Sequence, residues 1–163
     1  MGETTRESVI IRPATRADAN FIYHIGTHCF TDAWKKETVI HDLEQPLSHY
    51  WVAEFEQQVI AFACFWFVVD ELQLVNIAVE APFRRQGIAK KLLDAGIKEA
   101  KEYEIKTMFL EVRVSNEPAQ FFYKKQGLSI DFPKLFNVDE DRLRKKSLDV
   151  KMCISFLKKT VIL

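Results

Sequence analysis

Three local patterns follow one another between residues 72 and 102, and together they constrain the fold more than any other part of the chain. Residues 72–79, LQLVNIAV, are mostly apolar and typical of a buried strand. A short basic turn, PFRRQG, follows and ends at Gly87. From Ile88 onward apolar residues recur at helical spacing, with charged residues between them. A strand, a glycine turn and an amphipathic helix in succession predict an α/β architecture.

The patterns before this unit predict further strands and two helices. Residues 8–12 are typical of a short strand, and residues 15–29 open with capping-box spacing and continue as an amphipathic helix. Apolar residues within 30–48 have near-helical spacing, which predicts a second, short helix. Two apolar runs within 50–69 flank a polar turn. We expect these runs to form an antiparallel series with the strand that ends before the basic turn.

The patterns after the unit predict one more strand and helix, then a tail. Residues 107–114 are strand-like, and Asn116 is a good N-cap for a helix that ends at Gly127. The tail, residues 128–157, contains two further strand-like runs. They are separated by a charged stretch, 139–146, that we expect to form an exposed loop or a short helix.

Composition excludes several classes of function. The chain has 163 residues, 48% of them hydrophobic, enough for one domain over residues 1–163. Lys and Arg total 23 and Asp and Glu also total 23, so no net charge draws the chain to nucleic acid or to an anionic membrane. Three separated cysteines without a CxxC pair predict reduced thiols and a cytoplasmic location. The longest apolar run, 59–69, is shorter than the roughly 20 residues that span a bilayer, and no signal-peptide pattern is evident.

The basic turn has the chemistry of a phosphate site. Unpaired N–H groups at a helix N-terminus attract phosphate, and Gly87 allows a ligand to approach the backbone closely. Arg84, Arg85 and Lys90 add positive charge beside the same helix start. The GxGxxG and GxxxxGK[ST] patterns are absent, which excludes the dinucleotide and Walker interpretations. By itself the turn is compatible with a pyrophosphate site of another kind and with an ordinary strand-to-helix turn whose arginines are solvated.

Two segments identify a family by resemblance. LVNIAVEAPFRRQGIAKKLL and, after it, FLEVRVSNEPAQFFYKKQGL resemble the paired motifs of the GCN5-related N-acetyltransferase (GNAT) superfamily. They are most similar to the RimI-like branch, the ribosomal-protein-alanine N-acetyltransferases, and the strong similarity covers residues 76–128. The resemblance implies an α/β (α+β) fold. Its central sheet is mixed but mostly antiparallel, is splayed at the cofactor site and has helices on both faces.

The resemblance also implies acetyl-CoA as co-substrate and no metal. In the family, a bulged strand separates from its neighbour, and pantetheine enters the gap by strand-like pairing. The backbone of Ile77, Ala78 and Val79 would serve it here. The residues expected to hold the pyrophosphate or touch the cofactor are Arg85, Gln86, Gly87, Ile88, Ala89, Lys90 and Asn116.

Catalysis in this family starts from a protonated amine. An α-amine with a pKa near 8 is roughly one tenth neutral at pH 7, so a base must remove its proton. By resemblance, Glu111 is the expected general base and Tyr123 the acid that protonates the departing thiolate. We find no activating base for Cys29 or Cys64, so we expect direct transfer without an acyl-enzyme.

The motifs are compatible with three functions, which differ in the acceptor or in whether transfer occurs. The RimI-like similarity favours the α-amine of a protein N-terminus, with Phe30 and Trp34 as acceptor-binding residues. One alternative is a small-molecule amine such as a polyamine or amino sugar, because one fold serves many acceptors. Another is a non-catalytic acetyl-CoA-binding module. His24 and His28 have the i, i+4 spacing of metal ligands, but no third ligand is evident, so we predict no metal. We expect a monomer or a homodimer.

Overall fold

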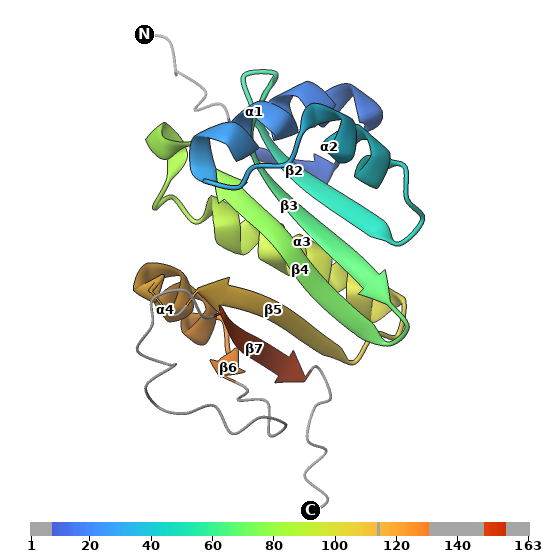
Figure 1. The fold of residues 1–163 in the computed structure, drawn as a ribbon, viewed down its shortest axis with the longest axis vertical. Coiled ribbons are helices and arrows are strands. Elements are labelled where there is room, and N and C mark those ends of the chain that lie inside the picture. Colours follow the sequence, from blue (N-terminus) through green and yellow to red (C-terminus); the bar gives the residue numbers. More distant parts are fainter. Residues whose placement is uncertain (1–7, 114, 131–148, 156–163) are drawn as a thin grey trace, which may run out of the picture.

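A computed structural model describes residues 8–113, 115–130 and 149–155. A mixed, seven-stranded sheet in the order β1-β2-β3-β4-β5-β7-β6 runs through it (Figure 1). Among the strands of the described residues, only β4 and β5 pair in parallel, and the other neighbouring pairs are antiparallel. The strands are β1 Ile10–Pro13, β2 Ser48–Phe55, β3 Gln58–Val68, β4 Glu71–Val79, β5 Thr107–Arg113, β6 Ser129–Ile130 and β7 Asp149–Ser155. This arrangement confirms the predicted mixed, mostly antiparallel sheet.

Helices cover both faces of the sheet, also as predicted. Figure 1 shows α1 and α2 on one face and α3 behind the other. The helices are α1 Ala19–Cys29, α2 Lys36–Leu43, α3 Ile88–Glu102 and α4 Glu117–Lys125, with short 3-10 turns at Arg16–Asp18 and Ala81–Phe83. The two strands predicted in the tail are β6 and β7, whereas the charged stretch 139–146 lies outside the described residues.

The helix starts follow from local sequence. The N–H of Thr15 donates to the carboxylate of Asp18 at 2.7 Å, which gives the predicted capping interaction before α1. The side chain of Asn116 accepts a hydrogen bond from the N–H of Ala119 at 3.2 Å and caps α4 as predicted. Gly87 caps α3 with φ +78°, a left-handed conformation that favours glycine.

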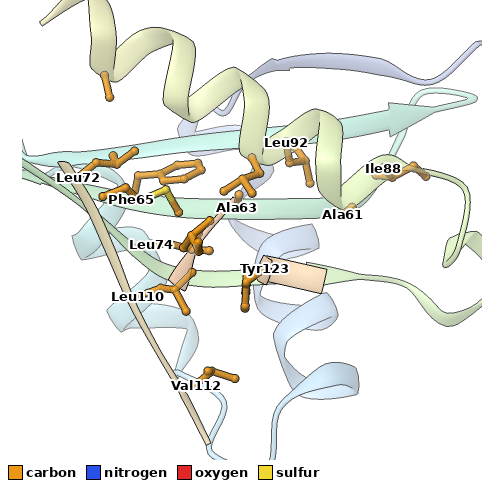
Figure 2. Packing of buried hydrophobic residues seen from close by; sticks show 14 of the residues in the cluster. Ala61, Ala63, Phe65, Leu72, Leu74, Ile88, Leu92, Leu110, Val112 and Tyr123 are labelled. Carbon is orange, nitrogen blue, oxygen red and sulfur yellow. The ribbon is translucent and has the colours of Figure 1, made fainter. Parts of the chain in front are cut away.

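Two hydrophobic clusters fix the helices on the sheet. The larger one packs α3 against the sheet and takes in Tyr123 of α4; Phe65, Leu72 and Leu92 lie inside it (Figure 2). The smaller one packs α1 and α2 on the opposite face, around residues such as Ile22 and Val52. Because strand side chains alternate in direction, β3 and β4 contribute to both clusters.

A β-bulge in β4 opens the sheet. Cys64 pairs with Asn76 and Phe65 pairs with Leu74, so Val75 is an extra residue on β4. The parallel pairing of β4 with β5 ends just there, at Leu74 and Leu110. Beyond this point the two strands diverge (Figure 1). The bulge and the splay that the family resemblance predicted for this strand are therefore confirmed.

Candidate active site

A cleft of about 810 Å³ lies where β4 and β5 separate. Its walls come from both strands, from the start of α3, from α4 and from the loop between α1 and α2. Eight of the residues predicted for the site line this cleft: Phe30, Ile77, Ala78, Val79, Ala89, Glu111, Asn116 and Tyr123. The fold thus gathers residues from four separate parts of the sequence at one opening in the sheet.

The backbone of β4 faces the cleft at alternate residues. The N–H of Glu80 donates to the carbonyl of Ile60 on β3 at 2.9 Å. Since backbone groups of a strand alternate between its two neighbours, the N–H and C=O groups of Val79 and Ile77 point away from β3, toward the cleft. The backbone of Ala78 points to β3, where Ala78 pairs with Phe62. Of the three predicted residues, Ile77 and Val79 can therefore form strand-like hydrogen bonds with a ligand.

The turn before α3 brings backbone N–H groups to the end of the cleft. Arg85 has φ +60° and Gly87 has φ +78°, so the chain bends sharply before the helix begins. The first N–H groups of α3 have no partner within the helix and can bind an anion. The side chain of Ile88 is buried, with 2% exposure, which leaves only its N–H for a ligand.

The side chains of Gln86 and Lys90 are exposed and bonded locally. The amide of Gln86 donates to the carbonyl of Pro82 at 3.3 Å, and Lys90 forms an ion pair with Asp94 at 2.6 Å. Neither side chain lines the cleft, whereas Ala89 does. The amide of Gln86 and the ammonium of Lys90 therefore have partners outside the cleft. The backbone N–H groups at the start of α3 remain as hydrogen-bond donors for an anion.

Arg84 connects the turn to β4 and to α1. Its Nε donates to the carbonyl of Val79 at 2.8 Å, and its Nη2 lies 3.4 Å from the Sγ of Cys29. The side chain lines the cleft. From the sequence Arg84 was expected only to add charge, because contacts between residues 55 positions apart leave no local signal.

Glu111 lies at the point where the sheet opens. It is the first residue of β5 after the last residue paired with β4, Leu110. Its side chain is exposed and lines the main cleft as well as a smaller pocket of about 260 Å³. Trp66 and Val75 line the same small pocket and pack on the α1 and α2 cluster, so the pocket lies on that face of the sheet.

Tyr123 approaches the cleft from the opposite face. It lies on α4 and belongs to the larger cluster with Leu110 and Val112 (Figure 2). Its side chain lines the cleft although the residue is only 7% exposed. Burial raises the pKa of the Tyr123 phenol to about 12, so the phenol keeps its proton at neutral pH. The cleft thus has a carboxylate on one side and a phenol on the other.

The two predicted acceptor residues lie in different places. Phe30 lines both the main cleft and a small, mostly apolar pocket under α1. Trp34 lines that small pocket and does not reach the main cleft, and it stacks on Trp66 with 6.3 Å between ring centroids. Asn76, at the bulge, lines both spaces and marks where they join.

Comparison with known protein families shows to which family this chain belongs. A sequence model of the Acetyltransferase (GNAT) family matches residues 19–128, which include both walls of the cleft. The chain belongs to the GNAT family. As a GNAT acetyltransferase it is an acetyl-CoA-dependent enzyme that acetylates amines, as the motifs predicted.

Several GNAT relatives have similar sequences or folds. The putative ribosomal protein bS18-alanine N-acetyltransferase of Bacillus subtilis is 35% identical over 72% of this chain and 79% of its own length. The ribosomal protein bS18-alanine N-acetyltransferase of Haemophilus ducreyi is 33% identical over 74% of this chain and 82% of its own. The crystal structure of an Escherichia coli ribosomal-protein-alanine N-acetyltransferase superposes with a TM-score of 0.78 at 24% identity, covering 96% of this chain and 99% of that one. The last comparison confirms the GNAT fold.

Two further observations concern the described part of this GNAT chain. None of its helices has the length and the apolar character needed to cross a membrane. Among the same residues, no three His, Cys, Asp or Glu side chains come together as metal ligands. His28, considered above as a ligand, instead contacts Glu80 at 2.8 Å.

Proposed function

We propose that this acetyltransferase moves the acetyl group of acetyl-CoA directly to the α-amine of a protein N-terminus, with alanine of a ribosomal protein as the favoured acceptor. The observation that supports the reaction best is the cleft through the sheet, with Glu111 on one face and Tyr123 on the other. The names of the relatives in Bacillus subtilis and Haemophilus ducreyi support the choice of acceptor.

The cofactor would enter along β4. The pantetheine arm carries amide groups, and these would pair with the exposed backbone groups of Ile77 and Val79 in place of the strand that has diverged. The pyrophosphate would lie on the N–H groups of the turn at Gly87 and of the first residues of α3. Arg84 would hold the carbonyl of Val79 in place. This pose directs the thioester toward the gap between Glu111 and Tyr123.

The reaction removes two protons from the amine nitrogen, adds one to the leaving thiolate and exchanges a C–S bond for a C–N bond. Glu111 takes a proton from the ammonium group, directly or through water, and the neutral nitrogen attacks the thioester carbon. The C–N bond forms, the nitrogen releases its second proton to water, and the C–S bond breaks. Tyr123 gives its proton to the coenzyme A thiolate and regains one from water. The N–H of Val79, which points into the cleft, would stabilise the negative charge on the thioester oxygen, a contribution worth about 3 to 4 kcal/mol in other enzymes.

Thiol release from acetyl-CoA tests this proposal. Peptides that begin with Ala, Ser or Met would be compared with polyamines and amino sugars, for the wild type and for Glu111→Gln. We expect release with alanine peptides and a fall in kcat of roughly 10²- to 10⁴-fold in the variant, because the base is lost. Glu117→Gln is the matched control, since Glu117 is an exposed carboxylate on α4 that does not line the cleft.

Three other results of the thiol-release assay would each change the proposal. Release with metabolites alone would replace the protein acceptor with a small amine. Equal rates for Glu111→Gln and the wild type would remove Glu111 from the role of base. Binding of acetyl-CoA without release for any acceptor would contradict the proposed transfer.

A further inference from the structure

The α2 helix carries a buried carboxyl group on the α1 and α2 face of the sheet. Asp42 is only 9% exposed, and its oxygens accept hydrogen bonds from four side chains. The donors are the Tyr50 hydroxyl at 2.6 Å, the Ser48 hydroxyl at 2.9 Å, the Trp66 Nε1 at 3.2 Å and the Cys64 Sγ at 3.5 Å. Burial raises the pKa of Tyr50 and of Cys64, so both remain protonated donors at neutral pH.

Such a network fixes the positions of its members. A buried carboxyl group is costly unless it is hydrogen-bonded, and a fully satisfied network holds its side chains in one geometry. The hydrogen bond from Trp66 to Asp42 spans 24 positions of the sequence and connects β3 to α2. The indole ring of Trp66 therefore has a fixed orientation.

Trp66 holds this orientation beside the proposed base. Its side chain and that of Glu111 line the same pocket of about 260 Å³, on the face of the sheet opposite to Tyr123. That volume is several times the roughly 30 Å³ of one water molecule. Trp34, from the loop after α1, stacks on Trp66 with 30° between the ring planes. Trp34 thus supports the indole of Trp66, which borders the pocket of Glu111.

We propose that Trp66 is a specificity-determining residue that packs against the first residue of the acceptor, and that Asp42 is its positioning residue. The proposal rests on the function proposed above, because it assumes that the amine reaches Glu111. An amine within reach of Glu111 places the side chain of its own residue in the adjoining space, which Trp66 borders. An aromatic wall favours a small apolar side chain there over a charged one, because charge loses water on contact with it.

The two roles can be separated from catalysis by steady-state kinetics. Trp66→Phe keeps an aromatic ring but removes the indole N–H, and Asp42→Asn keeps the shape of the side chain but removes one acceptor oxygen. We expect each variant to raise the KM for an alanine peptide by roughly 3- to 10-fold, the effect of one lost hydrogen bond. The kcat and the KM for acetyl-CoA should stay within about twofold of the wild type, because neither residue lines the main cleft.

The double variant and one control decide the interpretation. If Asp42 acts through Trp66, the double variant should raise the acceptor KM no more than the larger single change. Ser48→Ala removes a donor from the same carboxyl group but leaves the Trp66 hydrogen bond, so its acceptor KM should match the wild type. An unchanged acceptor KM in Trp66→Phe would overturn the proposal, as would additive effects or a fall in kcat alone. Should Asp42→Asn fail to fold, Trp66→Phe alone still decides the role of Trp66.

The same kinetic measurements distinguish failure of the proposed function from failure of the inference about Trp66. If the proposed function fails, the wild type itself would not acetylate any peptide, and no acceptor KM could be measured. A wild type that acetylates peptides, together with a Trp66→Phe variant of identical acceptor KM, would overturn only the inference about Trp66.

Discussion

Tyr123 shows how burial prepares one side chain for its proposed role. The pKa of its phenol is about 12 in the fold, against about 10 when exposed, because the ionised form would lose its water. A raised pKa in the folded chain means that the associated stability is complete below pH 10 and is lost as the pH rises toward 12. At neutral pH the phenol would therefore be protonated and able to donate its proton to the coenzyme A thiolate.

Alkaline denaturation tests this shift. Relative to Tyr123→Phe, the wild type should lose about 1.4 kcal/mol of unfolding free energy between pH 9 and pH 11, because only the wild type has this phenol to ionise. Urea denaturation at both pH values measures the difference. Tyr50 also has a raised pKa, but it is present in both proteins and its effect cancels. Parallel losses in the two proteins would show that Tyr123 ionises normally.

At the scale of elements, α3 lies unusually close to the sheet at one point. A methyl group added at Gly96 would come within 2.3 Å of the buried ring of Phe65. Gly96→Ala should therefore destabilise the fold by about 1 to 2 kcal/mol, because overpacking outweighs the better helix propensity of alanine. Gly26→Ala in α1 is the matched control, since its methyl group meets only Phe30, at 3.9 Å. The control should be neutral or up to about 1 kcal/mol more stable, as thermal denaturation would show. Equal midpoints for both variants would contradict this packing.

The elements themselves could largely be predicted from the sequence, because their signals are local. The caps at Thr15 and Asn116, the turn at Gly87 and the strand patterns all involve neighbours in the chain. The hydrogen bond from Trp66 to Asp42 and the contact of Arg84 with Cys29 could not be predicted in this way, since the partners lie 24 and 55 positions apart. Trp66 lies in an apolar run whose pattern is typical of a core strand, yet it is half-buried at the wall of a pocket. Alternation along a strand indicates the face of a sheet but not whether a helix covers it.

At the scale of the whole molecule, the parallel pairing between β4 and β5 is short. It joins only Glu71–Leu74 to Thr107–Leu110, and β7 and β6 follow on the far side of β5. A cofactor arm that pairs with β4 and lies against β5 and α4, which form the other wall of the cleft, would connect the two sides of the opening. Under the proposed function, cofactor binding should therefore stabilise the β5 side of the sheet more than the β2 and β3 side.

Ligand-linked stability and hydrogen exchange test this expectation. Coenzyme A at 100 times its Kd should raise the unfolding free energy by about 2.7 kcal/mol. Amide protection should increase most in β5 and α4, which border the opening, and less in β2, which lies beyond β3 and away from it. A variant with Gly87→Val provides the control, because a β-branched residue is strained at φ +78° and should weaken the pyrophosphate contacts. Uniform protection across the sheet would indicate that the cofactor does not bridge the opening.

The bulge at Val75 also has a consequence for how the chain behaves among other proteins. By ending the β4–β5 pairing early, it gives one sheet two additional edges that face each other inside a single molecule. Exposed strand edges recruit foreign extended segments, and proteins usually protect them at the periphery of the fold. Here the turn before α3, α4 and the loop after α1 all contribute to the walls of the opening. The two edges that would receive a cofactor arm are therefore flanked by other elements of the fold and do not lie at the periphery of the sheet.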